Sequence, residues 1–322
     1  MRLCRFTPRD AILAGLSVAH LTLTLTLALT WRDGSAVTRF AGLPVVVLMT
    51  VYNIIVISHV FTHQAWFRSP FLNRLVSMLN SLNIAQSVKA YELFHVRNHH
   101  RYHNDRKRAD GTTGDFSSTF RDGEGDDHAG LLRYAFWGAA TTLLGVGRAL
   151  LSVLRLWRVG GRESELRSLL SRNPLKRRAE QRQIQLDRMA LSVGIVLFLA
   201  LDWQWAVFVY LPALYLSFAL VNVQNYYEHY GASPEDRYAN SVSYYGRLYN
   251  LLTFNDGYHQ EHHLSPQAHW SRLPQIRAGG LSQAQGKHHL VSPVPALLGF
   301  LHRGRAVRWR ERPAVRQVRR GA

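Results

Sequence analysis

The chain has 322 residues, enough for one large domain or two small ones, and a formal net charge of +18. Its single cysteine, Cys4, excludes internal disulfides, a CxxC pair and a cysteine-ligated iron–sulfur cluster within one chain. The mean hydropathy of −0.13 hides long apolar runs that alternate with stretches rich in Arg and His. Nucleic-acid binding would explain the charge but not these runs, so we expect no nucleic-acid partner.

Four apolar segments are candidate membrane spans, at about residues 11–31, 40–58, 186–201 and 205–223. About 20 apolar residues are needed to cross the bilayer core. The third segment is short by that measure unless Leu186 and the tryptophans around Asp202 are included. Two further apolar stretches, 71–90 and 131–157, are interrupted by Arg, Asn or Gly. They favour amphipathic helices at the membrane interface, with full spans as the alternative.

The positions of Lys and Arg predict the orientation, because these residues gather on the cytoplasmic side. Only Arg32 and Arg39 lie between the first two spans, whereas most of the others lie in 64–188 or after Tyr230. Both termini and the long middle segment are therefore expected to be cytoplasmic, in what we expect to be a bacterial cytoplasmic membrane.

The predicted fold is thus an all-α integral membrane protein with four transmembrane helices in two hairpins and a helical cytoplasmic cap. We expect a single domain over residues 1–322, with the cap at 59–185 and 224–290 and a basic C-terminal tail at 291–322.

Ten of the 16 histidines fall in four tight clusters, all on the predicted cytoplasmic side. The clusters are His59 and His63; His95, His99, His100 and His103; His229; and His259, His262 and His263. An isolated HxxxH pair is usually incidental, but so many clustered imidazoles on one face are hard to explain without a metal site.

Helical spacing explains how these residues could ligate metal. Residues i and i+4 share one helix face, which pairs His59 with His63, His95 with His99, and Asn225 with His229. Adjacent histidines point about 100° apart, so such a pair can serve two neighbouring ions. The clustered imidazoles exceed the need of one ion and predict two; imidazole suits Zn, Cu, Fe and Ni, so ligand type leaves the metal open.

In these residues the chain resembles the membrane fatty acid desaturase and hydroxylase superfamily, whose boxes read HxxxH, HxxxHH or HxxHH, and HxxHH. His59–His63, the HVRNHH that starts at His95 and the HQEHH that starts at His259 fit in that order. The NYYEHYG that starts at Asn225 also resembles the NYxEHYG motif of the alkane monooxygenases. The resemblance covers about residues 11–274, although the first box lacks a Glu and the second has the longer spacing.

The resemblance implies a helical stem, a cytoplasmic cap and two iron ions, with O2 as co-substrate. The nine implied ligands are His59, His63, His95, His99, His100, His229, His259, His262 and His263. It also implies a water-mediated contact between Asn225 and iron.

Ligating imidazoles usually donate their second N–H to a carboxylate or carbonyl, which fixes the tautomer. Candidates for this support, by proximity in sequence, are Glu92, Asp105, Asp115, Glu228, Asp256 and Glu261. His103 and His269 are also expected beside the ligands, with His269 and Trp270 lining the entrance to the site. Solvated loop residues are the alternative for each carboxylate. His20, His128, His288, His289 and His302 are expected to be structural or solvated.

The leading functional hypothesis is an O2-dependent oxidoreductase that desaturates a fatty acyl chain. A hydroxylase or oxidative decarboxylase of alkyl chains is the alternative, favoured by NYYEHYG, and a histidine-rich metal transporter or sensor is an alternative of another class. The chain has no HPGG haem motif and no rubredoxin cysteines. Two electrons are therefore expected from an external ferredoxin-like or rubredoxin-like donor, which the basic cytoplasmic face would attract.

Overall fold

The computed structural model describes residues 3–153, 162–280, 289–302 and 309–310, and the regular structure in these residues is mainly helical. The amino-terminal part contains α1 (Asp10–Thr30), α2 (Ala36–Tyr52), η1 (Asn53–Ser58), α3 (His59–His63), α4 (Pro70–Asn83), α5 (Val88–Glu92), η2 (Leu93–His99) and α6 (His100–Tyr102). The middle contains η3 (Arg133–Trp137), α7 (Gly138–Val153), α8 (Arg162–Leu169), α9 (Pro174–Trp205), η4 (Ala206–Tyr210) and α10 (Leu211–His229). The remainder contains α11 (Arg247–Leu252), α12 (His259–Leu264), η5 (Trp270–Arg272), α13 (Leu273–Gly280), β1 (His289–Leu290), η6 (Ala296–Leu301) and β2 (Trp309–Arg310).

Three helical segments are long and apolar enough to cross a membrane: Asp10–Thr30, Ala36–His63 and Pro174–His229. Only 28%, 50% and 44% of their most apolar windows are buried within the protein. Apolar helices that leave half or more of such a surface uncovered need an apolar solvent, because soluble proteins bury a long apolar face. The chain is therefore a membrane protein.

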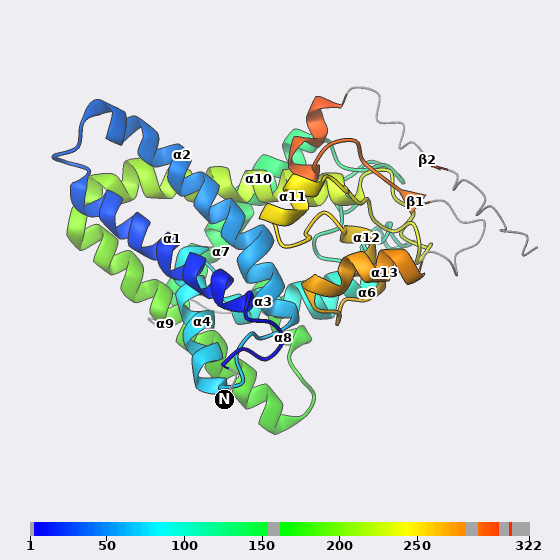
Figure 1. Cartoon of the computed structure of the whole chain (residues 1–322), viewed down its shortest axis with the longest axis horizontal. Helices are drawn as coiled ribbons and strands as arrows, with labels where there is room; N and C mark the ends of the chain where they lie inside the picture. Colours follow the sequence, from blue (N-terminus) through cyan, green and yellow to red (C-terminus); the bar gives the residue numbers. More distant parts are fainter. Residues whose placement is uncertain (1–2, 154–161, 281–288, 303–308, 311–322) are drawn as a thin grey trace, which may run out of the picture.

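The 56-residue segment Pro174–His229 is broken at Asp202, whose backbone leaves the helical region (φ −158°, ψ 102°). The Asp202 carboxylate caps the helix that follows, accepting from the N–H groups of Gln204 (2.9 Å) and Trp205 (3.0 Å). Its other oxygen accepts from Arg32 Nε at 2.8 Å, which links this break to the turn between α1 and α2. Figure 1 shows α1 and α2, and likewise α9 and α10, meeting at the same end of the molecule.

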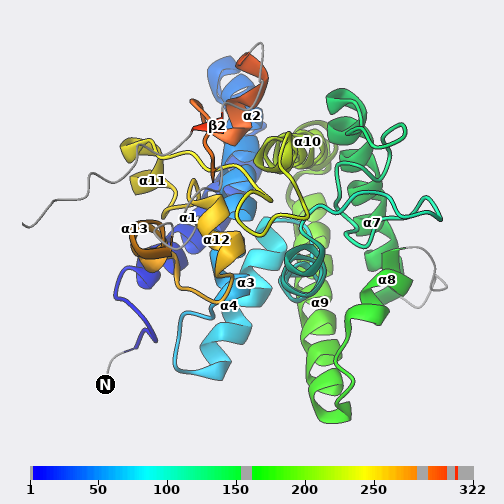
Figure 2. The ribbon, with the colours of Figure 1, turned by 90° about the vertical axis from the view of Figure 1, so that its right-hand side faces the viewer.

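The helical part packs around one main core formed by α1, α2, η1, α4, α9 and α10. At the broken end of α9, the ring of Trp205 stacks on that of Tyr210, Phe198 packs against both, and all three are almost fully buried. The short elements lie at the end of the molecule opposite Asp202, where the long helices also end. Figure 2 views this end face-on. Helices α3, α6, α12 and the last turn of α10 therefore converge there.

The two stretches expected to be interfacial form α4 with α5, and η3 with α7. Residues 84–87 separate α4 from α5, and Ala85 in that break has a positive φ of 52°. Helix α4 packs along α9 and α1, while α7 packs along α10 and α9. These stretches therefore form part of the helical bundle, and α7 also leaves Leu144 and Leu151 exposed.

Candidate metal centre

The nine histidines implied as ligands come together in two groups at the end of the helical bundle opposite Asp202. The first group is His59, His63, His95, His100 and His262. The second group is His99, His229, His259 and His263. Within each group the ligand atoms lie within 4.8 Å of one another.

Imidazole nitrogens face each other at distances that suit a shared ion. His59 Nε2 lies 3.1 Å from His262 Nε2 in the first group, and His99 Nε2 lies 3.3 Å from His263 Nε2 in the second. Two nitrogens about 2.1 Å from one ion, at angles between 90° and tetrahedral, are about 3.0–3.4 Å apart. The donor set therefore fits two metal ions of the imidazole-binding class.

Burial keeps these imidazoles in the neutral form that ligates metal. Burial lowers the pKa of His95, His100, His259, His262 and His263 well below the ordinary value, and the neighbouring histidines lower it further. A metal ion binds neutral imidazole, so it does not have to displace protons from these side chains.

The second histidine box adopts a π-helix rather than the α-helix expected. The backbone N–H of His100 bonds to the carbonyl of His95, five residues earlier. This wider turn brings His95 Nε2 within 3.1 Å of His100 Nε2, and both belong to the first group. The rings of His95 and His99 still stack, with 5.3 Å between centroids, so the two side chains share one face as predicted. His99 nevertheless joins the second group, so the two residues serve different groups.

Helix α12 supplies both groups from one short helix. His262 lies in the first group, while His259 and His263, four residues apart, lie in the second. His262 and His263 thus diverge, as do His99 and His100, in agreement with the expected 100° rotation between adjacent residues. All three histidines of α12 are buried, and Glu261 between them accepts from Tyr245 (2.7 Å) and Ser243 (3.0 Å).

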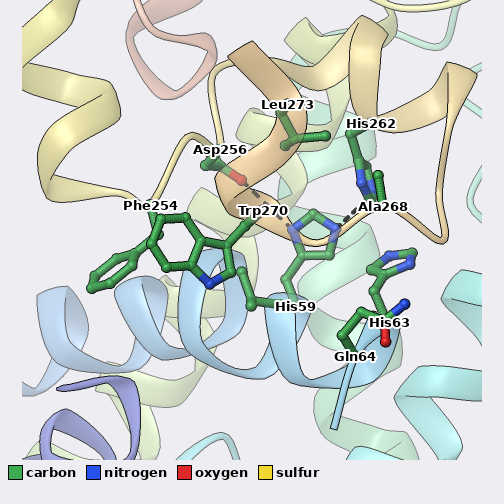
Figure 3. Close-up of a pocket in the computed structure, with 10 residues that line it drawn as sticks. His59, His63, Gln64, Phe254, Asp256, His262, Ala268, Trp270 and Leu273 are labelled. Carbon is green, nitrogen blue, oxygen red and sulfur yellow. Dashed lines mark hydrogen bonds and ion pairs between the residues drawn. The ribbon is translucent and has the colours of Figure 1, made fainter. Parts of the chain in front are cut away.

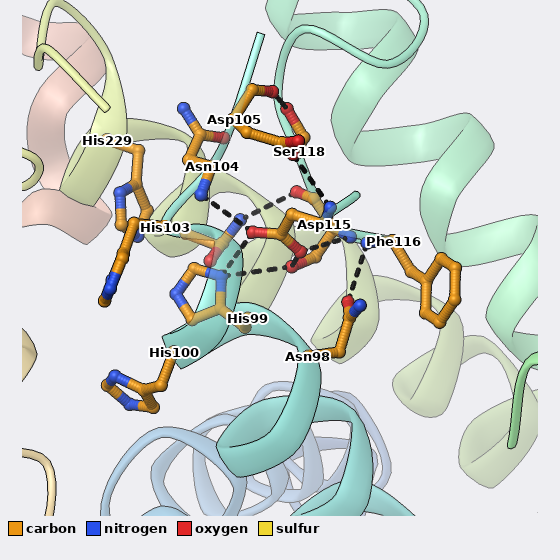
Figure 4. A network of polar contacts seen from close by, with 12 residues as sticks. Asn98, His99, His100, His103, Asn104, Asp105, Asp115, Phe116, Ser118 and His229 are labelled. Carbon is orange, nitrogen blue, oxygen red and sulfur yellow. Dashed lines mark hydrogen bonds and ion pairs between the residues drawn. The ribbon is translucent and has the colours of Figure 1, made fainter. Parts of the chain in front are cut away.

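Asp115 is the most firmly held of the expected supporting carboxylates (Figure 4). It is fully buried, lies 2.7 Å from His99 Nδ1, and accepts from the N–H groups of Asn104 and Ser117. Burial alone would raise its pKa, but the interaction with His99 and these hydrogen bonds outweigh burial and lower it. The carboxylate is therefore ionised, and it fixes the His99 tautomer with Nε2 free for metal.

Two further carboxylates face the Nδ1 atoms of two expected ligands, one in each group. Asp256 Oδ1 lies 3.6 Å from His59 Nδ1, and Glu228 Oε1 lies 3.6 Å from His259 Nδ1. The Nδ1 of His229 lies 3.0 Å from the carbonyl of Asn240, a supporting group that sequence proximity did not indicate.

The other expected supporting residues stand further from the histidines. Asp105 accepts from the N–H groups of Gly114 (2.7 Å) and Asp115 (2.8 Å) and so supports the Asp115 loop. Glu92 pairs with Lys89 (2.5 Å). His269 Nε2 lies 3.1 Å from the buried Asp10 Oδ1, which also accepts from Trp270 Nε1; the role of Asp10 was not apparent from sequence.

His103 lies beside a histidine of the second group, whereas Asn225 contacts Tyr134 and the backbone of Ser117. His103 Nδ1 lies 3.1 Å from His263 Nδ1, and its backbone is left-handed (φ 52°). Asn225 Nδ2 donates to Tyr134 (2.5 Å) and lies 3.5 Å from the carbonyl of Ser117. A water-mediated contact between Asn225 and iron stays a prediction.

A cleft borders the first group (Figure 3). His59, His63 and His262 form one side, and Phe254, Trp270 and Leu273 supply apolar walls. The Trp270 ring packs edge-on against Phe254, with 5.0 Å between centroids. The arrangement places an apolar surface directly beside the histidine nitrogens.

Comparison with known proteins supports the resemblance to membrane desaturases at the level of the family. The two relatives found are proteins called sphingolipid delta(4)-desaturase from yeasts. That of Candida albicans is 56% identical over 39 residues, which is 12% of this chain and 10% of the relative. That of Komagataella phaffii is 45% identical over 76 residues, which is 21% of this chain and 19% of the relative.

The matched stretches thus span a fifth or less of those two proteins. No solved structure matches the chain. The sequence model of the fatty acid desaturase family, in contrast, matches residues 38–293, which include every histidine of both groups. The chain belongs to the fatty acid desaturase family.

Proposed function

We propose that this protein is a membrane desaturase that removes two hydrogens from an acyl or alkyl chain of a lipid, using O2 and two external electrons. The observation that carries the proposal is the division of nine buried or half-buried histidines into a group of five and a group of four. Membership of the fatty acid desaturase family supports the choice of iron among the metals that imidazole binds.

One iron would be held by His59, His63, His95, His100 and His262, and the other by His99, His229, His259 and His263. When bound, the iron pair supplies the oxidising power that O2 and two electrons provide for attack on an unactivated C–H bond. The protein's own part is to orient the imidazoles and to hold the lipid chain in a fixed position. Phe254, Trp270 and Leu273 suit the second task, since they offer an apolar surface beside the first group.

A four-span topology is part of the proposal. The segment Pro174–His229 has 56 residues, or about 84 Å of helix, whereas the bilayer core is about 30 Å thick. The break at Asp202 lets this segment cross twice, as one hairpin beside that of α1 and α2. Both groups would then lie in a cap on one side, which we propose is cytoplasmic, and the chain would form a single domain.

A sphingolipid chain is the substrate class that the two relatives favour, because both are named sphingolipid delta(4)-desaturase. They do not favour a hydroxylase, a decarboxylase or a metal transporter. Both relatives are yeast proteins, so the expected bacterial origin has no support from them.

The electron donor stays a prediction. Cations near the second box are the nearest docking candidates, but they also make internal contacts. Arg106 pairs with Glu235 (3.3 Å), and Lys107 donates to the carbonyl of Gly123 (2.5 Å).

The test is to express the protein in a host that lacks sphingolipid desaturation and to measure its lipids by mass spectrometry. We expect a product two hydrogens lighter than the substrate, which His262→Ala abolishes. His302→Ala, a histidine outside both groups, is the matched control and should retain the product. A product heavier by one oxygen would contradict desaturation, and equal activity of both variants would contradict the assigned site.

A further inference from the structure

Gln224, in α10, connects the carboxylates of Glu228 and Asp256, which face expected ligands of different groups. Its side-chain Nε2 donates to Glu228 Oε1 at 2.8 Å and to Asp256 Oδ2 at 2.9 Å. An amide nitrogen carries two hydrogens, and these two short bonds match that number; a third acceptor, the Tyr249 hydroxyl, lies further away at 3.5 Å. Gln224 is only 3% exposed, so water cannot easily replace it as a donor.

The backbone explains why this one side chain reaches both carboxylates. Glu228 lies four residues after Gln224 on α10, and residues at that spacing share one helix face. Asp256 follows two non-glycine residues with left-handed backbones, Phe254 (φ 53°) and Asn255 (φ 66°). Such conformations cost free energy and persist only where surrounding contacts hold them. Here Asn255 is held by bonds from its N–H to Asn250 (2.9 Å) and from its amide to Trp270 (3.2 Å).

Each carboxylate faces the Nδ1 atom of a different group's histidine. Asp256 Oδ1 lies 3.6 Å from His59 Nδ1, of the first group, and Glu228 Oε1 lies 3.6 Å from His259 Nδ1, of the second. The His59 nitrogen also lies 3.2 Å from the carbonyl of Ile55, so Asp256 shares the support of that ring. In the described part of the chain, His259 Nδ1 is buried and has no hydrogen-bond partner within normal distance, and the Glu228 carboxylate faces it at 3.6 Å. Tyr249 donates to Asp256 Oδ2 at 2.8 Å, and its hydroxyl also lies 3.5 Å from Gln224 Nε2.

We propose that Gln224 is a positioning residue that bridges the supporting carboxylates of the two metal groups and so fixes the orientation of His59 and His259 together. This inference rests on the proposed function. Without the amide, two acidic side chains would lie beside each other in a buried site with no common donor, and they would separate. Each would then move relative to the imidazole it faces.

The test compares Gln224→Met with Gln183→Met in purified, iron-loaded protein. Methionine keeps the length of the side chain and removes both donors. Gln183 makes the same i, i+4 bond to a buried carboxylate, Asp187 (2.8 Å), and is the matched control because Asp187 has three other donors and lies outside both groups.

We expect Gln224→Met to lower kcat by roughly 10- to 100-fold at an unchanged substrate KM, the usual range for groups that support metal ligands. The Mössbauer signals of both irons should also change, or iron should be lost from both sites. Gln183→Met should match the parent protein. A parent-like spectrum and kcat in Gln224→Met, or a change confined to one iron, would overturn the bridge.

Tyr249→Phe provides a second measurement if Gln224→Met fails to insert. It removes the bond to Asp256 (2.8 Å) and a long contact with Gln224 Nε2 (3.5 Å) but leaves both Gln224 bonds to the carboxylates. It should therefore alter chiefly the signal of the iron on the His59 side, and an unaltered spectrum would overturn the inference. Parent protein without iron and without desaturated product would instead refute the proposed function, and the bridge with it.

Discussion

The carboxylate of Asp115 shows how much of a metal ligand's behaviour depends on one buried neighbour. Its Oδ2 lies 2.7 Å from His99 Nδ1, and its lowered pKa keeps it ionised at neutral pH. Asp115→Asn keeps the size but replaces one acceptor oxygen by an NH2 group, which cannot accept the His99 proton. We expect iron affinity or turnover to fall by roughly 10- to 100-fold, measured by iron content and kcat. Asp122→Asn, an exposed carboxylate in the same loop region, should have no effect, and equal results for the two would contradict this role.

His103 combines a left-handed backbone with a contact to a ligand, and substitutions can separate these features. Its φ is 52°, and its Nδ1 lies 3.1 Å from His263 Nδ1. Asn tolerates this backbone and offers an acceptor oxygen, whereas Ala offers neither advantage. We expect His103→Asn to retain more iron and turnover than His103→Ala, by several-fold. Equal loss in both variants would show that neither feature matters separately.

At the scale of elements, a π-helical turn directly precedes the first histidine box. Asn53 and Ser58 begin and end η1, and Ser58 Oγ donates to Asn53 Oδ1 at 2.7 Å across this turn. Asn53 Nδ2 faces His20 of α1 (3.3 Å) and donates to Asn80 of α4 (3.2 Å), so neighbouring helices hold the turn in place. The turn therefore sets the rotation at which His59 leaves the helix.

Asn53→Leu removes all three contacts at similar volume, so we expect η1 to relax and the first group to lose its alignment. Leaving buried polar partners unpaired costs about 1–3 kcal/mol each. Elemental analysis should show iron falling from two toward one per chain. The control Ser217→Ala removes another buried hydroxyl, which bonds to the carbonyls of Ala213 in its own helix (2.7 Å) and Val47 in α2 (3.3 Å), and should keep both ions. Two ions and full turnover in Asn53→Leu would refute the dependence.

These elements also show what the sequence could and could not predict. Apolar length predicted α1 and the helix that contains α2, and histidine spacing predicted which side chains gather, because both depend on local residue patterns. The π-helical turns were not predictable, since they follow from packing between helices, such as the contacts of Asn53. For the same reason the partners Gln224 and Asp10 had no signal in sequence, as they meet Asp256 and His269 only in the folded chain.

At the scale of the whole molecule, the proposed four-span topology would place the two helix turns and the histidine groups on opposite sides of a membrane. Arg32 in the first turn pairs with Asp202 at the second break, so the two hairpins meet there. Glu124 lies in the exposed part of the loop that follows the second histidine box. Because Cys4 is the only cysteine, a Cys4→Ser background allows single cysteines to report on each side.

We expect Ser35→Cys in that background, at the turn before α2, to react with a membrane-impermeant maleimide in intact cells. Glu124→Cys should react only after permeabilisation, because the proposed cap is cytoplasmic. Ser35 and Glu124 are both exposed, so a difference between them reports sidedness rather than burial. Reaction of both positions in intact cells would contradict the hairpins. The reverse pattern would keep the four spans but place the histidine groups on the outer side, where a cytoplasmic electron donor could not reach them.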